Sequence, residues 1–190
     1  MQKIMFNDRY HHTNAVIEGR KTRATQIMAG IDFPVNMVMG RVLPDKDGKI
    51  YAVANGENII VKLRYKVGEV VAVAQCYNDV VREFTDLAFV PGSTNKMFVR
   101  ADLMPHQIRI IGIRCERLRD ISDEDCIKEG VYAGSQALEY PYYFIDTKQF
   151  LICDYKSPRE AFAALIDKVS GRGTWDRNPW VVAYEFELVK

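Results

Sequence analysis

Short apolar segments rich in β-branched residues recur along this chain, and turn-forming residues separate them. Segments 35–43 and 50–53 flank a turn-rich stretch, 44–48, so they are predicted to form a hairpin. An Asn-Gly pair at 55–56 predicts a second turn before another strand at 59–63. This spacing limits the chain to folds in which strands supply most of the core.

A long strand is predicted over 107–118. Its isoleucines change face between Ile110 and Ile111, next to Gly112, so that Ile111 and Ile113 lie on the face opposite Ile110. Such a change of phase predicts a β-bulge or a sharp bend. Bends of this kind help a small sheet to curl.

A strand is also predicted at 180–188, where large apolar residues alternate with neighbours of the other face. Three short helices complete the prediction. One follows Ser157, which forms a capping box with Glu160. The others lie near 122–130 and 13–19, and each stops at a glycine. The chain is therefore predicted to be a mixed α+β protein built on a curled sheet.

With 190 residues the chain has the size of one domain. We expect residues 1–190 to form a single domain with long connections, or insertions, near 77–96 and 132–155. The second connection is rich in tyrosine, and we interpret it as an irregular excursion packed onto the sheet.

The formal net charge of +1 argues against bulk electrostatic capture of duplex DNA. Cys76, Cys115, Cys126 and Cys153 form no CxxC pair and are predicted to be reduced thiols. No segment resembles a signal peptide or a membrane span, so we expect a cytoplasmic protein without membrane partners.

The sequence has no phosphate-binding loop, no dinucleotide fingerprint and no nucleophile elbow, so we expect no cofactor. His11 and His12 are adjacent and point in different directions in most backbones, which makes them a loop or a helix cap rather than a metal site. The acidic run 123–125 is interpreted as charge that complements a helix start, so no metal is expected.

A basic cluster follows directly after Gly19. It contains Arg20, Lys21, Thr22 and Arg23. Because a glycine-stopped helix precedes these side chains, the backbone is expected to hold them in place, which suits them to contact a phosphate or a nucleobase.

Four motifs occur along the chain in one order. They are Gly19-Arg20-Lys21-Thr22, Tyr65-Lys66-Val67-Gly68-Glu69-Val70, residues 117–125 and Trp175-Asp176-Arg177-Asn178-Pro179-Trp180-Val181. Together the four motifs resemble the ASCH domain family, a branch of the PUA-like β-barrels, in the longer form found in bacteria and their phages. The resemblance implies a small curled PUA-like barrel with a few short helices packed on it and a cleft near the Gly-Arg-Lys-Thr loop.

The resemblance also implies a ligand, RNA or a modified nucleoside. Some compact members of the family are amidohydrolases that remove an acetyl group from N4-acetylcytidine, and others are ribonucleases. In the amidohydrolases a lysine, a threonine three residues later and a glutamate act together. The lysine falls on Lys21 and the glutamate on Glu129, but the threonine position holds Ala24.

Thr25 lies one residue after the position where the family has its threonine. On an extended segment, a shift of one residue moves the side chain to the other face. We therefore expect Thr25 to reach the site only if a bulge realigns it.

The leading hypothesis is an RNA- or nucleoside-binding module in which Lys21 and Glu129 frame the cleft and Arg20, Thr22 and Arg23 line it. Trp175, in a glycine-rich loop, is a candidate for stacking on a base.

The enzyme alternative is metal-independent amide hydrolysis with Lys21 as proton shuttle, Glu129 as its partner and Thr25 or Thr22 as nucleophile. A ribonuclease, or a protein-interaction module that uses 132–155, is a third possibility. The oligomeric state is not predicted.

Overall fold

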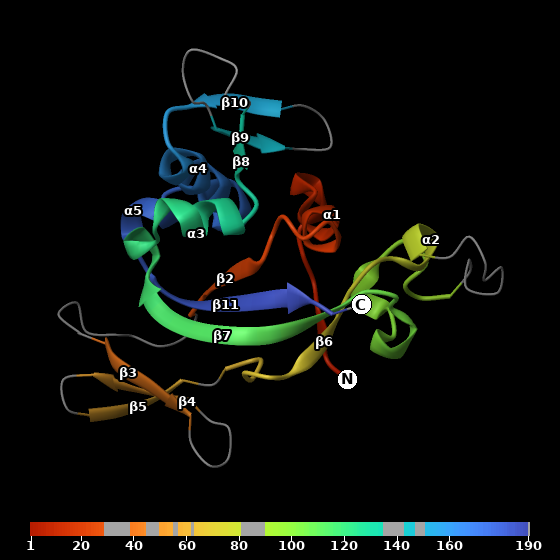
Figure 1. Ribbon diagram of the computed structural model, residues 1–190, viewed down its shortest axis with the longest axis horizontal. Helices are drawn as coiled ribbons and strands as arrows, with labels where there is room; N and C mark the ends of the chain where they lie inside the picture. Colours follow the sequence, from red (N-terminus) through yellow and green to blue (C-terminus); the bar gives the residue numbers. More distant parts are fainter. Residues whose placement is uncertain are drawn as a thin grey trace.

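The computed structural model describes residues 1–28, 39–44, 50–54, 57–61, 63–80, 90–134, 143–146 and 151–189. It is an α+β structure in which short helices surround a five-stranded sheet (Figure 1). The predicted mixed α+β class is confirmed. Within these residues, no helix combines the length and the apolar character that crossing a bilayer requires.

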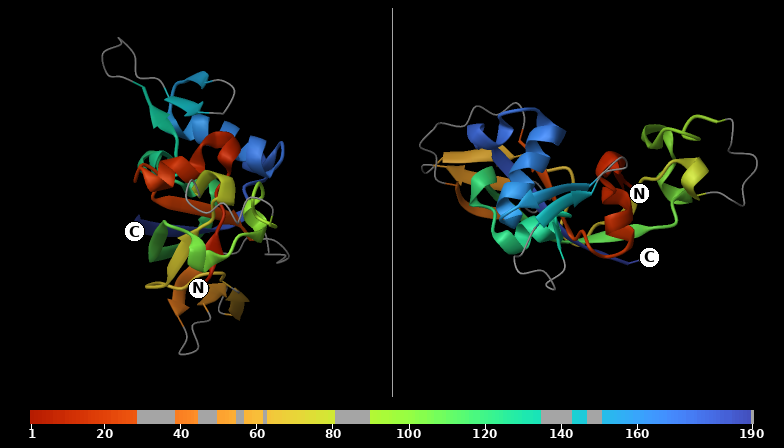
Figure 2. Two further views of the ribbon diagram at one scale, coloured as in Figure 1. Left: turned by 90° about the vertical axis from the view of Figure 1, so that its right-hand side faces the viewer. Right: turned by 90° about the horizontal axis from the view of Figure 1, so that it is seen from above.

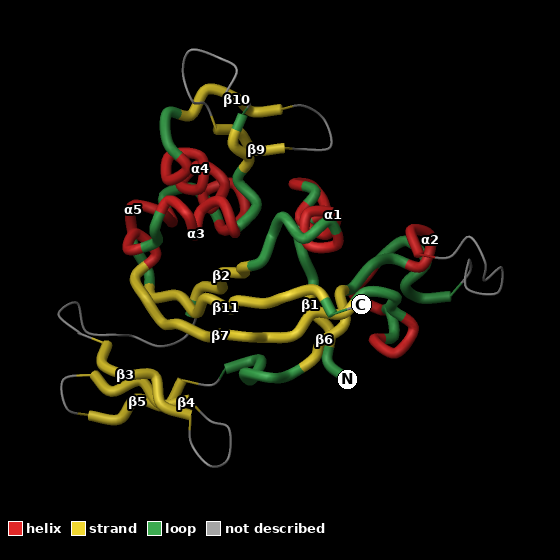
Figure 3. The backbone as a smooth tube through the Cα atoms, viewed as in Figure 1, coloured by secondary structure: helices red, strands yellow, loops and turns green. Residues whose placement is uncertain are grey.

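The main sheet has a mixed topology. Its strands, in spatial order, are β1 (Lys3–Ile4), β6 (Val70–Val73), β7 (Gln107–Arg117), β11 (Trp180–Leu188) and β2 (Arg23–Ile27). β1 and β6 are parallel, and the other neighbours are antiparallel. The long strands β7 and β11 run side by side in an arc (Figure 3). Over the described residues the sheet is open, with β1 and β2 at its edges, and no closed barrel is found.

The predicted β-bulge lies in β7. Glu185 of β11 pairs with Gly112, and the next residue, Phe186, pairs with Ile110, so Ile111 has no cross-strand partner in this ladder. Ile111 is 51% exposed. The extra residue resets the alternation, so Ile113 packs against the same core as Ile110. The bulge is confirmed, whereas the predicted placement of Ile113 on the opposite face is wrong.

Two small three-stranded sheets accompany the main one. The first contains β3 (Met39–Pro44), β4 (Ile50–Ala54) and β5 (Glu57–Val61). Their antiparallel pairing confirms both predicted hairpins, although the turns at 45–49 and 55–56 fall outside the described residues.

The second small sheet contains β8 (Tyr132–Ala133), β9 (Tyr143–Asp146) and β10 (Leu151–Tyr155). The expectation of an irregular excursion over 132–155 is therefore wrong for the part that the structure describes. Aromatic residues favour strands as well as loops, and Tyr132 stacks on Phe144 with ring centroids 4.9 Å apart.

The three predicted helices are present: α1 (His12–Ile17), α3 (Asp123–Lys128) and α4 (Pro158–Ser170). Ser122 caps α3 and Ser157 caps α4, each by accepting a backbone N–H three residues later. The carboxylate of Glu160 accepts the backbone N–H of Lys156 and so completes the cap from the other side.

The remaining helices were not predicted. α2 (Tyr77–Val80) and α5 (Thr174–Arg177) have four residues each. Single turns are η1 (Asp8–Tyr10), η3 (Lys96–Phe98), η4 (Ala101–Leu103) and η5 (Leu118–Asp120). Elements this short carry too few residues for a periodic apolar pattern.

Both faces of the main sheet are covered where β11 crosses it. Val182, Tyr184 and Phe186 enter one apolar cluster, together with Val16 of α1. The neighbouring Val181 belongs to a second cluster, which α3 and α4 cover. In two views at right angles, α3, α4 and the β8–β10 sheet lie on one side of the main sheet, and the β3–β5 sheet lies on the other (Figure 2).

Candidate functional site

The segment after α1 is held by backbone hydrogen bonds. Gly19 adopts φ +72°, a left-handed conformation that ends the helix. The N–H groups of Arg20 and Lys21 then donate to the carbonyl of Ala15 at 2.8 and 2.9 Å, and Thr22 donates to the carbonyl of Lys128 at 3.0 Å. The expected anchoring of the basic cluster is therefore present, and it joins α1 to the end of α3.

Glu129 lies at the end of α3. Its N–H donates to the carbonyl of Asp125 at 3.0 Å, and Gly130 follows with φ +102°. The sequence positions Glu129 through two local signals, the Ser122 cap and the glycine stop.

Lys21, Thr25 and Glu129 converge. Lys21 Nζ lies 2.8 Å from Glu129 Oε2 and 2.5 Å from the Glu129 carbonyl oxygen. The Thr25 hydroxyl donates to the other carboxylate oxygen, Oε1. The side chains of the ion pair are only 3% and 6% exposed. The structure thus brings together the three residues that the sequence proposed as catalytic.

Burial governs the charge of Lys21. Removal from water lowers the pKa of its ammonium below the ordinary value, and the charge and hydrogen bond of Glu129 oppose that shift. The ammonium therefore gives up a proton more readily than a surface lysine does, which is the property required of a proton shuttle.

Thr25 reaches Glu129 without a bulge. β2 pairs with β11 in unbroken register from Arg23 opposite Glu185 to Ile27 opposite Val181. Residues 21, 23 and 25 alternate along this extended segment and share one face, whereas Ala24 packs into the core on the other face. The expectation that Thr25 requires a realigning bulge is wrong.

Arg23 is fully buried inside a ring of carboxylates. Nη1 lies 2.7 Å from Asp125 Oδ2, Nη2 donates to Glu116, and Nε lies 3.4 Å from Glu129 Oε1. Arg114 Nη2 also donates to Asp125 at 2.6 Å. The expectation that Arg23 contacts phosphate is wrong, since its guanidinium has no exposed surface. The interpretation of the acidic run 123–125 as charge that only complements a helix start is incomplete, because the carboxylate of Asp125 binds two arginines.

A cavity of about 160 Å³ adjoins this group. It is lined by Ile4, Met5, Phe6, Asn7, His12, Lys21, Ala24, Thr25, Gln26, Glu129, Phe162, Leu165, Ile166 and Val169. Polar groups from β2 and α3 meet an apolar wall from α4 and the N-terminal segment. Such a cavity can bury a flat apolar body and present hydrogen-bonding groups to its polar edge.

None of the four predicted ligand-binding residues lines this cavity: Arg23 is buried among carboxylates, and the other three lie elsewhere. Arg20 pairs with Glu18 at 2.5 Å and lies over the ring of Tyr132, 4.4 Å from its centroid. Thr22 pairs through its backbone with β11 and α3. Trp175 packs against Phe162 of α4, with ring centroids 6.2 Å apart.

His12 is a residue of the cavity that the sequence analysis took for a loop or a cap. It begins α1, is 9% exposed and lines the cavity beside Lys21. Burial, together with the positive charges of Lys21 and Lys96, lowers its pKa to about 2, so the imidazole is neutral. One signal in the sequence could have indicated that His12 is buried. It lies three and four residues before Ala15 and Val16, a spacing that places all three on one face of a helix.

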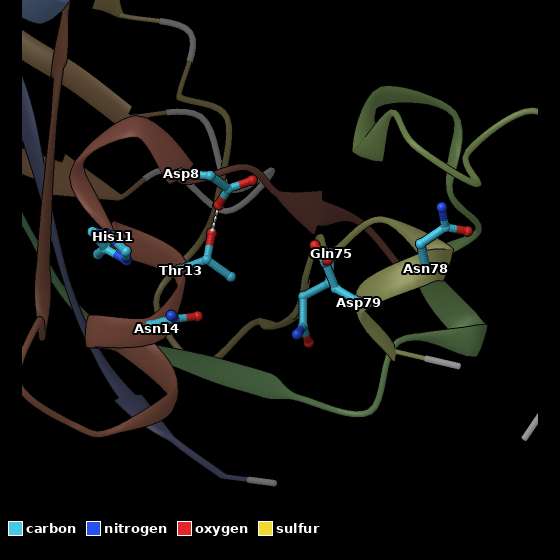
Figure 4. Close-up of a pocket in the computed structure, with 7 residues that line it drawn as sticks. All are labelled: Asp8, His11, Thr13, Asn14, Gln75, Asn78 and Asp79. Atoms are coloured by element: carbon cyan, nitrogen blue, oxygen red, sulfur yellow. Dashed lines mark hydrogen bonds between the residues drawn. The ribbon is translucent and has the colours of Figure 1, made fainter. Parts of the chain in front are cut away.

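A second cavity, of about 430 Å³, lies between α1 and α2 (Figure 4). Its lining is polar: Asp8, His11, Thr13, Asn14, Gln75, Asn78 and Asp79. Lys96 pairs with Asp8 at 2.9 Å, which offsets part of the acidic charge. Among the described residues, no three His, Cys, Asp or Glu side chains are grouped so as to hold a metal ion.

No family model, no curated protein and no solved structure matches the chain.

Proposed function

We propose that the protein is an ASCH-type, PUA-like domain that binds a modified nucleoside in the Lys21 cavity and hydrolyses an amide bond on it. N4-acetylcytidine represents the substrate class. One observation carries the proposal: the buried carboxylate of Glu129 holds the Thr25 hydroxyl on one oxygen and the Lys21 ammonium on the other, at the wall of a cavity.

The first step forms an acyl-enzyme. Thr25 Oγ1 attacks the acyl carbon while its proton passes to Glu129 Oε1, the oxygen that it already contacts. Lys21 uses two of its three N–H groups on Glu129. Its third N–H has no acceptor among the described residues, so it is available to stabilise the oxyanion.

The second step releases the products. The tetrahedral intermediate collapses, the C–N bond breaks, and the leaving amine takes a proton from the Glu129–Lys21 pair. Water then attacks the Thr25 ester and gives a proton to Glu129, the bond between the acyl carbon and Thr25 Oγ1 breaks, and Oγ1 takes that proton from Glu129. The net products are the free amine and acetic acid, which ionises to acetate and a proton, and the reaction as written requires no co-reactant besides water.

The sheet supports the PUA-like part of the proposal. A PUA-like domain requires a strongly curled sheet, and the bulge at Ile111 bends the longest strand in the position that the sequence predicted. The site lies where the segment that joins α1 to β2, together with β2 itself, meets the end of α3.

Incubation of the purified protein with N4-acetylcytidine, followed by chromatography for cytidine, tests the function. We expect turnover that is lost in Thr25→Val and in Lys21→Met. Thr94→Val, at an exposed threonine outside the cavity lining, is the matched control and should keep wild-type activity. Absence of turnover in a folded protein, or turnover that survives Lys21→Met, would reject the hydrolytic mechanism.

A second candidate is nucleoside or RNA binding without turnover. The apolar wall of the cavity favours it, because a base can be buried there whether or not it reacts. Since Arg23 is buried and Arg20 is paired with Glu18, recognition would rest on the base and not on phosphates. Affinity for cytidine or a short RNA should then change little between 50 and 200 mM salt, a range over which phosphate contacts lose affinity steeply.

A further inference from the structure

His12 is a polar residue of the Lys21 cavity that has no task in the hydrolytic steps. It is 9% exposed, and it lies in the lining together with Lys21, Thr25 and Glu129. Within the part of the chain that the structure describes, neither ring nitrogen has a hydrogen-bond partner. The ring nitrogens are not among the fully buried unpaired atoms, so they keep some accessible surface where a ligand in the cavity can supply a hydrogen bond.

The position of the ring is fixed by close packing. A Cβ atom added to Gly130 would lie 3.4 Å from His12 Cδ2 and 3.6 Å from Lys21 Cδ, so both side chains press against the backbone that follows Glu129. Tyr10 packs on His12 with ring centroids 5.9 Å apart. His12 Nε2 lies 3.6 Å from the same Cβ position, so the imidazole is held next to the reactive group by packing and not by hydrogen bonds of its ring.

The ring is neutral, since burial and two nearby ammonium groups disfavour its protonation. A neutral imidazole donates from one nitrogen and accepts at the other. The two nitrogens point in diverging directions, so one of them donates to, or accepts from, a single polar atom of a ligand, such as a carbonyl oxygen or a ring nitrogen of a pyrimidine base.

The charge of the cavity favours an uncharged ligand. Lys21 is neutralised by Glu129 at 2.8 Å, and the opposite wall is apolar. An anionic ligand would lose its hydration here without gaining an unpaired cation.

We propose that His12 is a specificity-determining residue of the Lys21 cavity and that one of its ring nitrogens forms a hydrogen bond with an uncharged pyrimidine-like ligand. The inference rests on the proposed function for the identity of the substrate. It assigns His12 to ligand recognition and not to the chemical step, so its removal affects KM and not kcat.

Two measurements test the role of His12. The first compares the kinetics of His12→Leu, His12→Asn and the wild type with N4-acetylcytidine. We expect the leucine variant to raise KM about tenfold, the cost of one lost hydrogen bond, with kcat nearly unchanged. Asparagine keeps a donor and an acceptor and should recover part of the loss. His11→Asn, which suits the left-handed backbone there and lies outside this cavity, is the control.

The second measurement follows the ring ¹⁵N resonances of His12 in the folded wild type during titration with cytosine and, separately, with benzoate as an anionic probe. We expect cytosine alone to shift them.

The outcomes separate the two proposals. Shifted resonances without hydrolysis would reject the hydrolase and retain His12 as a ligand-binding residue. Hydrolysis with unshifted resonances and a wild-type KM in His12→Leu would overturn the role of His12 and leave the hydrolase standing. If neither hydrolysis nor any shift occurs, both proposals fail.

Discussion

Lys21 and Thr25 contact opposite oxygens of one buried carboxylate, that of Glu129. The lysine lies 2.8 Å from Oε2, and the threonine hydroxyl donates to Oε1. Both side chains extend from the same face of one extended segment. This segment passes the end of α3, where the Thr22 N–H donates to the carbonyl of Lys128. The carboxylate is therefore oriented before any ligand arrives, which lowers the reorganisation needed in a reaction.

The register of β2 makes a direct prediction about Thr25 and Ala24. Thr25→Val should reduce hydrolysis of N4-acetylcytidine by at least about 10³-fold, because the nucleophile is lost. Ala24 also lines the cavity, but it lies on the face of β2 opposite Thr25, so adding Ala24→Thr to that variant should restore nothing. Ala24→Thr alone should lower the free energy of unfolding by about 1–3 kcal/mol through overpacking. Steady-state kinetics and urea unfolding measure both effects, and recovery of activity in the double variant would show that the register is wrong.

The parts of the site that follow from local rules were predictable. Gly19 and Gly130 end helices, Ser122 begins one, and these signals place Lys21 and Glu129 at element ends. Whether two such ends meet depends on the topology of the sheet, and only the family resemblance linked them.

Long-range partners were not predictable in the same way. Nothing in the basic cluster distinguishes Arg23, which is buried among carboxylates, from Arg20, which lies at the surface. The difference arises because residue 23 faces α3 in the alternation of β2, and Asp125 lies there to meet it. His12 was missed for the same reason, since its cavity is built from α1, β2, α3 and α4 together.

The buried ion pair predicts strong coupling between Lys21 and Glu129. Lys21→Met should lower the free energy of unfolding by about 3–5 kcal/mol, because a buried carboxylate loses its main partner. The double variant Lys21→Met/Glu129→Gln should lose less than the sum of the single variants, by about 0.5–3 kcal/mol. A double-mutant cycle in urea measures this coupling. The half-exposed pair Arg109–Glu187 is the comparison, where solvent screening limits the loss to below about 1 kcal/mol. Additive losses at Lys21 and Glu129 would contradict a shared buried pair.

Neutral His12 predicts a loss of stability in mild acid. Its pKa is about 2 in the folded protein and 6.5 in the unfolded chain, so between these values only the unfolded state binds the proton. Stability therefore falls as the pH falls below 6.5, by up to about 1.4 kcal/mol per pH unit.

Urea unfolding between pH 6.5 and 5.0 isolates this effect from most carboxylates, which titrate lower. His106, whose pKa burial also lowers, contributes in the same direction. The comparison that matters is therefore between the wild type and His12→Asn, which should show a shallower slope. Equal slopes would mean that His12 is protonated, or accessible, in the folded state.

Trp175 should matter for stability and not for the ligand. It packs edge-on against Phe162 and lies 5.8 Å from the guanidinium carbon of Arg159, away from the cavity lining. Trp175→Ala should lower the free energy of unfolding by about 2 kcal/mol, less than for a fully buried tryptophan because the ring is half-buried. The KM for N4-acetylcytidine should not change, and Trp175→Phe should keep most of the stability. A raised KM with unchanged unfolding would instead place Trp175 on the ligand, as its glycine-rich surroundings first suggested.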